Sequence, residues 1–432
     1  MNYTYKQIWL INFPVMLSIL MEQLIHITDA IFLGHVGETE LGASALAGVY
    51  YLAIYMLGFG FSLGMQVLIA RHNGGQNYSL TGRTFFQGLY FLSALALLFC
   101  LLIDWFSPFL LKPLIKASDI YEAVICYLNW RSYGLLFSFP ALAFRAFFVG
   151  ITHTKALSRA AMGAIGINIL LNYLLIFRFG RGIAGAAMAS SLAEMGSLII
   201  QVLYLWLKID PVRYGLQVVY DKRLLGRLFR LSVWSMLHAF ISVVPWFLFF
   251  VAIEHLGRME LAISNITRSV SALFFVIVNS FATTTGSLVS NLIGAGEGYR
   301  LFAVCRKVLK LGYAVGFPLV VMALLGNHWI IGFYTHQTLL ARQAVIPFVV
   351  MLLNYTFALP GYVYIHAVTG TGDTRTAFVF QVVTILVYLF YIYLLSQWQQ
   401  VSLAVYMTAE YLFVILLAFQ SVIYLKKIVI RT

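Results

Sequence analysis

The chain has 432 residues, of which 62% are hydrophobic and only 10% are charged, and its net charge is +13. Its mean hydropathy of +0.89 excludes a soluble fold, which would have to expose more apolar surface than soluble monomers tolerate. We therefore expect the protein to be embedded in a lipid bilayer, which its apolar surface contacts. The basic residues are scattered over short polar intervals and form no single patch, so we expect no nucleic-acid partner.

Apolar segments of about the 20 residues needed to cross a bilayer recur along the whole chain. The sequence predicts an all-α membrane protein with twelve transmembrane helices, six on each side of one long polar interval. The predicted segments are 8–33, 45–70, 85–103, 123–148, 160–177, 183–207, 229–253, 262–292, 303–325, 341–368, 376–396 and 401–425.

The basic residues favour one side of these segments. If the N-terminus is cytoplasmic, the inner loops hold most of the lysines and arginines, including the run from Lys208 to Arg230. Short loops rich in Lys and Arg stay on the cytoplasmic side of a membrane. We therefore expect both termini to be cytoplasmic, in the cell (inner) membrane of a prokaryote.

The first segment carries charge where a bilayer opposes it. Glu22, His26 and Asp29 are spaced i, i+4 and i+7, so they lie on one side of a single helix. Charged groups inside a membrane normally line a protein interior or a wet cavity and handle ions, protons or substrate. The pattern predicts a coupling site at Asp29, with Glu22 and His26 as a proton relay. The alternative is that these groups only satisfy one another inside a bundle. Pro14 removes a helical hydrogen bond and is the predicted hinge of this helix.

The two halves of the chain are related by a repeat. HVGETEL at 35–41 matches HLGRMEL at 255–261, Pro140 matches Pro360, and the run from Gly150 matches the run from Gly370, all with an offset of 220. The repeat predicts an N-lobe at 1–207, a cytoplasmic linker at 208–228 and a C-lobe at 229–432. Because six helices per repeat is an even number, the lobes should be related by a pseudo-two-fold axis along the membrane normal.

Several of these motifs resemble the multidrug and toxic compound extrusion (MATE) transporters. They are the stretch TDAIFLGHVG at 28–37, the run NILLNYLLIF at 168–177, GIAGAAMAS at 182–190 and the loop GTGDTR at 370–375. The resemblance implies a secondary active antiporter that exports organic, cationic and lipophilic compounds in exchange for protons or sodium by alternating access. It also implies that the protein needs no cofactor and that a proton or a sodium ion is the coupling ion.

The resemblance extends to the site. Asp29, Asn168 and Ser190 match polar positions of the family's N-lobe cation site, whereas Asn172 stands where some members carry a second aspartate. Asn168 and Asn172 are spaced i, i+4, as are Ser190 and Glu194, so polar groups converge from three helices. We predict that Asp29, Asn168, Asn172, Ser190 and Glu194 form the coupling site, where sodium would be held by the first four. The alternative for the Asn and Ser side chains is interhelical hydrogen bonding alone.

The second half lacks the acids that sodium-driven NorM-like members carry on their seventh and tenth helices, because 234–250 and 354–368 contain no Asp or Glu. This departure favours the DinF-like branch. Glu410 is the one deep acid of the predicted C-lobe, and the offset places it opposite Ser190. It is predicted either to contact substrate or to be a satisfied structural acid.

Other classes of function lack support in the sequence. The chain has no GxxxxGK[ST] pattern, no HExxH and no nucleophile elbow, so we expect neither a nucleotide partner nor an enzyme. A lipid or lipid-linked oligosaccharide flippase of the same superfamily is the main alternative. Such proteins line their cavity with many basic residues, but here the intramembrane set is thin, mainly Arg131, Arg145 and Arg268. We expect the transporter to be monomeric.

Overall fold

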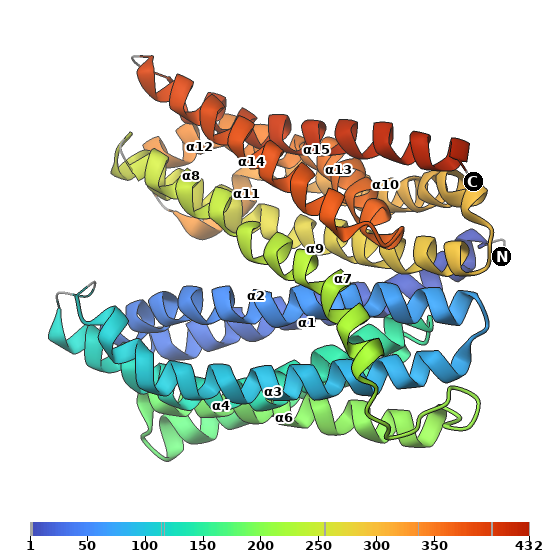
Figure 1. Ribbon diagram of the computed structural model, residues 1–432. Coiled ribbons are helices and arrows are strands. Elements are labelled where there is room, and N and C mark those ends of the chain that lie inside the picture. Colours follow the sequence, from blue (N-terminus) through green and yellow to red (C-terminus); the bar gives the residue numbers. More distant parts are fainter. Residues whose placement is uncertain are drawn as a thin grey trace. The chain divides into compact units, whose positions relative to one another are not determined.

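The computed structural model describes residues 3–113, 115, 117–254, 256–335, 337–398 and 401–431, without the side chains of 246, 247, 250, 251, 254, 258 and 429–431. Every regular element of this part is a helix (Figure 1). The elements are α1 (Tyr5–Gly34), α2 (Glu38–Gly74), α3 (Tyr78–Leu111), α4 (Ser118–Gly150), α5 (Lys155–Asn172), η1 (Tyr173–Arg178), α6 (Gly182–Lys208), α7 (Lys222–Ile241), α8 (Val244–Glu254), α9 (Arg258–Gly294), η2 (Gly298–Arg300), α10 (Leu301–Leu325), α11 (Asn327–Tyr334), α12 (Thr338–Leu353), α13 (Tyr355–Gly370), α14 (Thr374–Gln397) and α15 (Leu403–Arg431).

Twelve helical stretches of the described chain are long and apolar enough to cross a membrane. This number confirms the predicted all-α fold with twelve transmembrane helices. The apolar runs form helices because a helix satisfies all of its own backbone hydrogen bonds, which lipid cannot do.

Two predicted helices are interrupted. The segment 229–253 is divided into α7 and α8, because Pro245 has no N–H to continue the ladder from α7. The segment 341–368 is divided at Asn354 into α12 and α13. Pro360 in α13 frees the carbonyl of Thr356, and the Tyr313 hydroxyl donates to that carbonyl at 2.7 Å. A neighbouring helix thus satisfies the backbone group that the proline leaves open.

The repeat is visible in the helix boundaries. The 37 residues of α2 and the 37 residues of α9 start at Glu38 and Arg258, 220 positions apart. The turns that follow α4 and α13 each contain a residue with positive φ at the same offset, Thr152 (62°) and Gly372 (89°). The two halves therefore share one succession of helices and turns.

By packing, the chain forms two compact units. One unit is Phe13–Phe240, and the other combines the described parts of Met1–Asn12 and Ile241–Thr432. The start of α1 belongs to the second unit, where the Thr284 hydroxyl donates to Asn12 Oδ1 at 3.0 Å. Helix α7 packs with the first unit although its sequence belongs to the second repeat. The division into an N-lobe at 1–207, a linker at 208–228 and a C-lobe at 229–432 stays a prediction.

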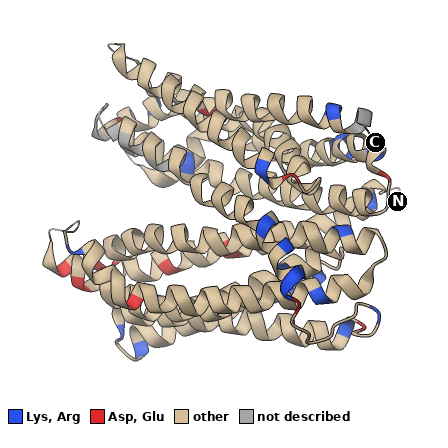
Figure 2. Ribbon diagram, in the orientation of Figure 1, with Lys and Arg blue, Asp and Glu red and all other residues tan. Residues whose placement is uncertain are grey.

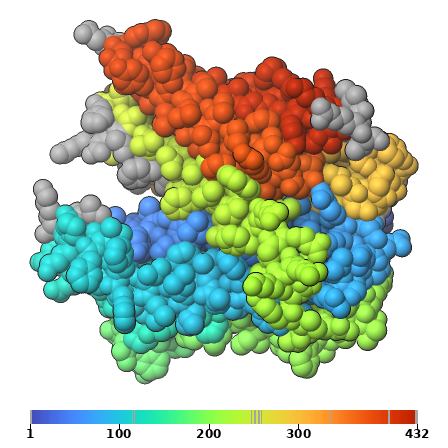
Figure 3. Space-filling view, in the orientation of Figure 1, coloured from blue at the N-terminus to red at the C-terminus, as the bar shows by residue number. Residues whose placement is uncertain are grey.

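The polar interval between the repeats is held against the first unit. The buried Gln87 side chain in α3 donates to the Val219 carbonyl at 2.6 Å and accepts from the Asp221 N–H at 3.1 Å. Helix α7 approaches α2 closely, since a Cβ atom on Gly64 would lie 2.6 Å from Ser232 Cα. Figure 3 shows this interval and the start of α7, in yellow-green, lying across the blue helices.

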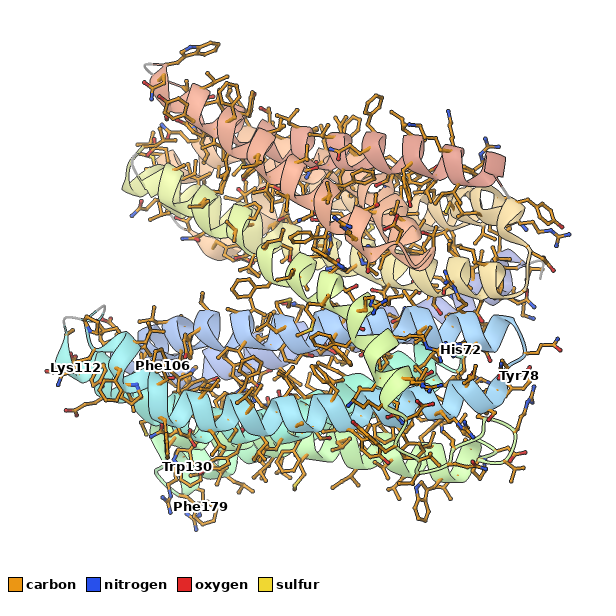
Figure 4. All side chains as sticks on the ribbon, in the orientation of Figure 1. His72, Tyr78, Phe106, Lys112, Trp130 and Phe179 are labelled. Atoms are coloured by element: carbon orange, nitrogen blue, oxygen red, sulfur yellow. The ribbon has the colours of Figure 1, made fainter. Side chains whose placement is uncertain are left out.

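Charged side chains of the Phe13–Phe240 unit separate along its helices. Figure 2 shows the acidic residues gathered mainly toward one end and the basic residues gathered mainly toward the other. Figure 4 places His72 and Tyr78 at one end and Lys112 and Phe179 at the other, as expected for helices that run up and down in turn. The helix ends therefore carry the charge asymmetry on which the sequence-based topology depends.

Candidate functional site

Four of the predicted coupling residues meet inside the first unit. Asp29 comes from α1, Asn168 and Asn172 come from α5, and Ser190 comes from α6. Asp29 is 8% exposed, and both asparagines are fully buried. The three helices thus bring one acid and three neutral polar groups into an apolar interior, where each group needs a protein partner.

Hydrogen bonds to the carboxylate organise this cluster. Asp29 Oδ1 accepts from Asn172 Nδ2 at 2.6 Å and from Asn168 Nδ2 at 3.0 Å. Asp29 Oδ2 accepts from Ser190 Oγ at 2.6 Å. The asparagines are also joined to each other, since Asn172 Nδ2 donates to Asn168 Oδ1 at 3.1 Å. Protein donors thus replace water around the carboxylate.

One acceptor of the cluster is unused. The buried Oδ1 atom of Asn172 has no hydrogen-bond partner in the structure. An unpaired buried polar atom costs about 1–3 kcal/mol, so such atoms need an explanation. A cation or a proton donor that enters the cluster would find this oxygen available.

The local backbone explains why the cluster forms here. Helix α5 ends at Asn172, and the chain continues as the π-helix η1, with the Phe179 N–H bonded to the Leu174 carbonyl at 2.9 Å. Extra-wide turns of this kind are frequent at functional sites. Helix α6 comes close because Gly185 has no side chain, and a Cβ there would lie 2.9 Å from the Leu175 carbonyl carbon. This π-helix departs from the ordinary helix that the sequence predicts over 160–177.

Glu194 is placed differently from its predicted role. It forms a two-point ion pair with Arg131 of α4, with N–O distances of 2.8 and 2.6 Å. The guanidinium also lies over the Tyr51 ring, 4.1 Å from its centroid. A buried guanidinium needs a counter-charge, and Glu194 supplies it. In the described chain no hydrogen bond connects Glu194 to Asp29, and their joint action as a coupling site stays a prediction.

Of the two predicted relay residues, Glu22 has partners outside the relay. Glu22 lies 3.6 Å from Arg145 of α4, and Ser18 Oγ donates to it at 3.4 Å. Its side chain is 45% exposed. His26 is exposed, and no hydrogen bond to its ring is present in the described part of the chain. A relay through Glu22 and His26 stays a prediction, as does the hinge at Pro14, which lies inside the continuous helix α1.

The second unit holds a third pair. Glu410 of α15 lies 3.8 Å from Arg268 of α9 and accepts from the Tyr388 hydroxyl at 3.3 Å. The Arg268 guanidinium lies over the Phe249 ring at 4.8 Å. Glu410 is therefore satisfied inside its own unit, and whether it also contacts substrate stays a prediction.

These pairs single out Asp29. Of the four deep acids on the first, sixth and twelfth predicted helices, Glu22, Glu194 and Glu410 each have an arginine within 4.0 Å. Within the described residues, Asp29 has no basic side chain at that distance. The sequence does contain a signal for two of these pairs. Arg131 and Arg145 stand about four turns apart on nearly one face of α4, and this face supplies the partners of Glu194 and Glu22.

A large cavity lies apart from this cluster. It has a volume of about 700 Å³ and belongs to the second unit, between α8, α9, α14 and α15, with Leu248, Ile392, Trp398 and Tyr406 among its walls. Its one carboxylate is Glu260, which stands in the first turn of α9, where acids stabilise the positive end of the helix dipole. The residues that line the cavity are mainly apolar.

Comparison with known proteins identifies the family of this chain. The MatE family model matches residues 14–174 and 235–394. The second match is displaced from the first by 221 residues at its start and 220 at its end, in agreement with the repeat. The matched stretches include Asp29, Asn168 and Asn172.

Two curated relatives illustrate the similarity. Multidrug and toxin extrusion protein 1 of Xenopus tropicalis is 28% identical over 308 residues, which are 68% of this chain but only 51% of that protein. The probable multidrug resistance protein NorM of Photorhabdus laumondii is 22% identical over 395 residues, which are 86% of this chain and 83% of that protein. This chain thus spans about half the length of the animal relative and most of the bacterial one.

The fold agrees with the sequence relationship. A structure described as the outward-facing conformation of a multidrug resistance MATE family transporter of the MOP superfamily superposes with a TM-score of 0.91. The alignment covers 98% of this chain and 96% of that one at 17% identity. The resemblance inferred from the motifs is therefore confirmed at the level of the family, whose members are transporters and not enzymes. The chain belongs to the MatE family of multi-pass membrane transporters.

Proposed function

We propose that this chain exports organic cations, including lipophilic ones, in exchange for a coupling cation that binds at Asp29. The observation that supports this function is the buried Asp29 carboxylate, which neutral groups surround and no described arginine neutralises. A bound cation stabilises a negative charge that is buried in the membrane, whichever side of the membrane the cation comes from. The names of the relatives, which describe extrusion of drugs and toxins, support the choice of substrate class.

Exchange follows if two cations compete for one charge. A coupling ion bound at Asp29 removes the cost of the buried carboxylate, and a cationic substrate near the same carboxylate lowers that cost as well. Each ligand then shifts the protein toward the state that binds it better, and the two need not be bound together. Alternating access requires only that these states open to opposite sides of the membrane.

We favour a proton as the coupling ion. The amide nitrogens of Asn168 and Asn172, and not their oxygens, face the carboxylate. Sodium needs oxygen ligands. Asn172 Oδ1 is unpaired, but the two amide nitrogens that contact Asp29 Oδ1 would have to be displaced before an ion could bind that carboxylate oxygen. A proton on Asp29 needs one acceptor, and the Ser190 oxygen lies at 2.6 Å. Rotation of the Ser190 hydroxyl would then be sufficient for its oxygen to accept a hydrogen bond from protonated Asp29.

Within the family we place this chain near the DinF-like branch. The sequence has no carboxylate in 234–250 or 354–368, where NorM-like members carry theirs. Glu410, the only deep acid among the described side chains of the second unit, already has Arg268 as a partner. Cation coupling in this chain would therefore depend on the first unit.

A flippase function is not favoured by these contacts. Binding of lipid phosphates requires basic side chains that are available to the ligand. Arg131 and Arg145 are each committed to a glutamate of their own unit, and Arg268 is committed to Glu410. The intramembrane arginines thus neutralise acids of the protein.

The proposed setting is the cell (inner) membrane of a prokaryote, with both termini in the cytoplasm. The distribution of basic residues supports this orientation. We expect cysteines introduced at Glu38 and Gln217 to differ in accessibility. A membrane-impermeant maleimide added to intact cells should label position 38 and leave position 217 unlabelled until the membrane is opened. Labelling of position 217 from outside would reverse the topology.

The decisive experiment separates the two driving forces. Purified protein in liposomes should transport a fluorescent organic cation when a proton gradient is imposed without sodium. A sodium gradient at constant pH should drive little flux. The reverse result would identify sodium as the coupling ion, and flux under neither gradient would contradict coupled exchange altogether.

A further inference from the structure

The repeat places a second cluster at the position that corresponds to the Asp29 cluster. The offset of 220 pairs Asn168 with Tyr388 and Ser190 with Glu410. The structure supports this pairing, because the two side chains touch in both units. Asn168 Nδ2 lies 3.2 Å from Ser190 Oγ, and the Tyr388 hydroxyl lies 3.3 Å from Glu410 Oε1. The same pair of helices therefore meets at the same level in each repeat.

The chemistry of the second cluster is rearranged. The counterpart of Asp29 is Phe249, which is buried and carries no charge. The negative charge stands instead on Glu410, at the position of Ser190. Arg268 fills the space between them, with its guanidinium 4.8 Å from the Phe249 ring and 3.8 Å from Glu410.

Other ionisable groups face this cluster from the helices around it. Tyr388 of α14 donates to Glu410, and Tyr362 of α13 interacts electrostatically with both Glu410 and Arg268. Both groups are neutral phenols, so Arg268 supplies the positive charge that the described residues place beside Glu410.

The counterpart of Arg268 in the first repeat is Gly48 of α2. A Cβ atom built on Gly48 would meet no atom within 4 Å, apart from those of its chain neighbours and its own helix backbone. The first repeat therefore has open space at the position from which, in the second repeat, an arginine reaches the cluster. Among the described residues no basic side chain lies within 4.0 Å of Asp29, whereas the permanently charged guanidinium of Arg268 lies 3.8 Å from Glu410.

We propose that Arg268 is a tethered cation that occupies, in the second repeat, the place of the exchangeable coupling cation of the first repeat. This inference rests on the proposed coupling function of Asp29. A guanidinium stays protonated at all physiological pH values and cannot leave the protein. Glu410 is thereby withheld from ion exchange, and Arg268 together with Gly48 determines that each transport cycle uses one repeat only.

The first test transfers the tethered cation to the other repeat. Gly48→Arg should lower gradient-driven efflux at least about tenfold, because the repeat predicts that an arginine at this position reaches the Asp29 cluster, where its fixed positive charge would compete with the coupling cation. The matched control is Gly48→Gln, which has a long polar side chain without charge and should keep most of the flux. Equal flux in the two variants, with equal amounts of folded protein in size-exclusion chromatography, would overturn the proposal.

The second test removes the cation from its own repeat. Arg268→Gln should expose Glu410 as an additional exchangeable site and raise the number of ions released per bound substrate about twofold, because a second carboxylate is then left without a counter-charge. Proton release would be measured in weakly buffered solution and sodium release with ²²Na. Arg268→Lys, and Arg268→Gln combined with Glu410→Gln, should both return the ratio to that of the wild type. A ratio that is unchanged in the folded Arg268→Gln protein would contradict the proposal.

The two tests can be separated from the proposed function itself. If Asp29→Asn keeps wild-type flux, the coupling function of Asp29 fails whatever the Gly48 variants do. If Asp29→Asn abolishes flux while Gly48→Arg transports normally, the coupling function stands and the role of Arg268 is rejected.

Discussion

Asp29→Asn is expected to abolish gradient-driven efflux and to leave the protein folded in the membrane. The change keeps the size of the side chain but removes the one acid among Glu22, Asp29, Glu194 and Glu410 that has no arginine partner within the described residues. The new amide would turn at least one donor toward the donors of Asn168, Asn172 and Ser190. The loss of such a hydrogen bond costs about 1–3 kcal/mol, which a large helical protein can tolerate. Efflux of a fluorescent cation from liposomes under an imposed proton gradient is the measurement.

The matched control is Asp104→Asn in α3. Asp104 is also an acid in an apolar helix, and it accepts from the Ser132 hydroxyl at 2.9 Å, but it lies outside the Asp29 cluster. This variant should keep its flux. Wild-type flux in Asp29→Asn over a series of pH values would show that the coupling site lies elsewhere, whereas loss of flux in both variants would indicate a general requirement for buried acids.

Arg131→Gln is expected to lower stability by about 3–5 kcal/mol, because it leaves the partly buried Glu194 without its counter-charge. Glu194→Gln should have a similar cost, since it leaves the Arg131 guanidinium unpaired over the Tyr51 ring. The double change, Arg131→Gln with Glu194→Gln, removes both charges and should recover much of the loss. Thermal unfolding of the detergent-purified proteins, followed by intrinsic fluorescence, gives the comparison.

Transport by the double variant then decides the role of Glu194. If the ion pair is structural, a stable double variant should transport with the pH dependence of the wild type. A shifted pH dependence would support the prediction, made from the sequence, that Glu194 belongs to the coupling site. Additive losses of stability in the double variant would instead show that the two side chains do not act as a pair.

The sequence by itself determined the features that follow from period and composition. Apolar runs of sufficient length can only be helices in lipid, so the twelve spans could be read directly. The constant offset of 220 predicted the repeat, which the helix boundaries and the two family matches show. The i, i+4 spacing placed Asn168 and Asn172 on one face, and the structure turns that face toward Asp29.

Only the tertiary structure decided which charges neutralise one another. The sequence around an acid such as Glu194 does not indicate which residue will pair with it. Arg131 is 63 positions away and comes within reach only when α4 packs on α6. The same holds for Arg268 and Glu410. A helical period shows which residues share a face, but it does not show which face of another helix will meet it. For that reason the sequence indicated several acids that could bind a cation, and the packing left one of them, Asp29, without an arginine.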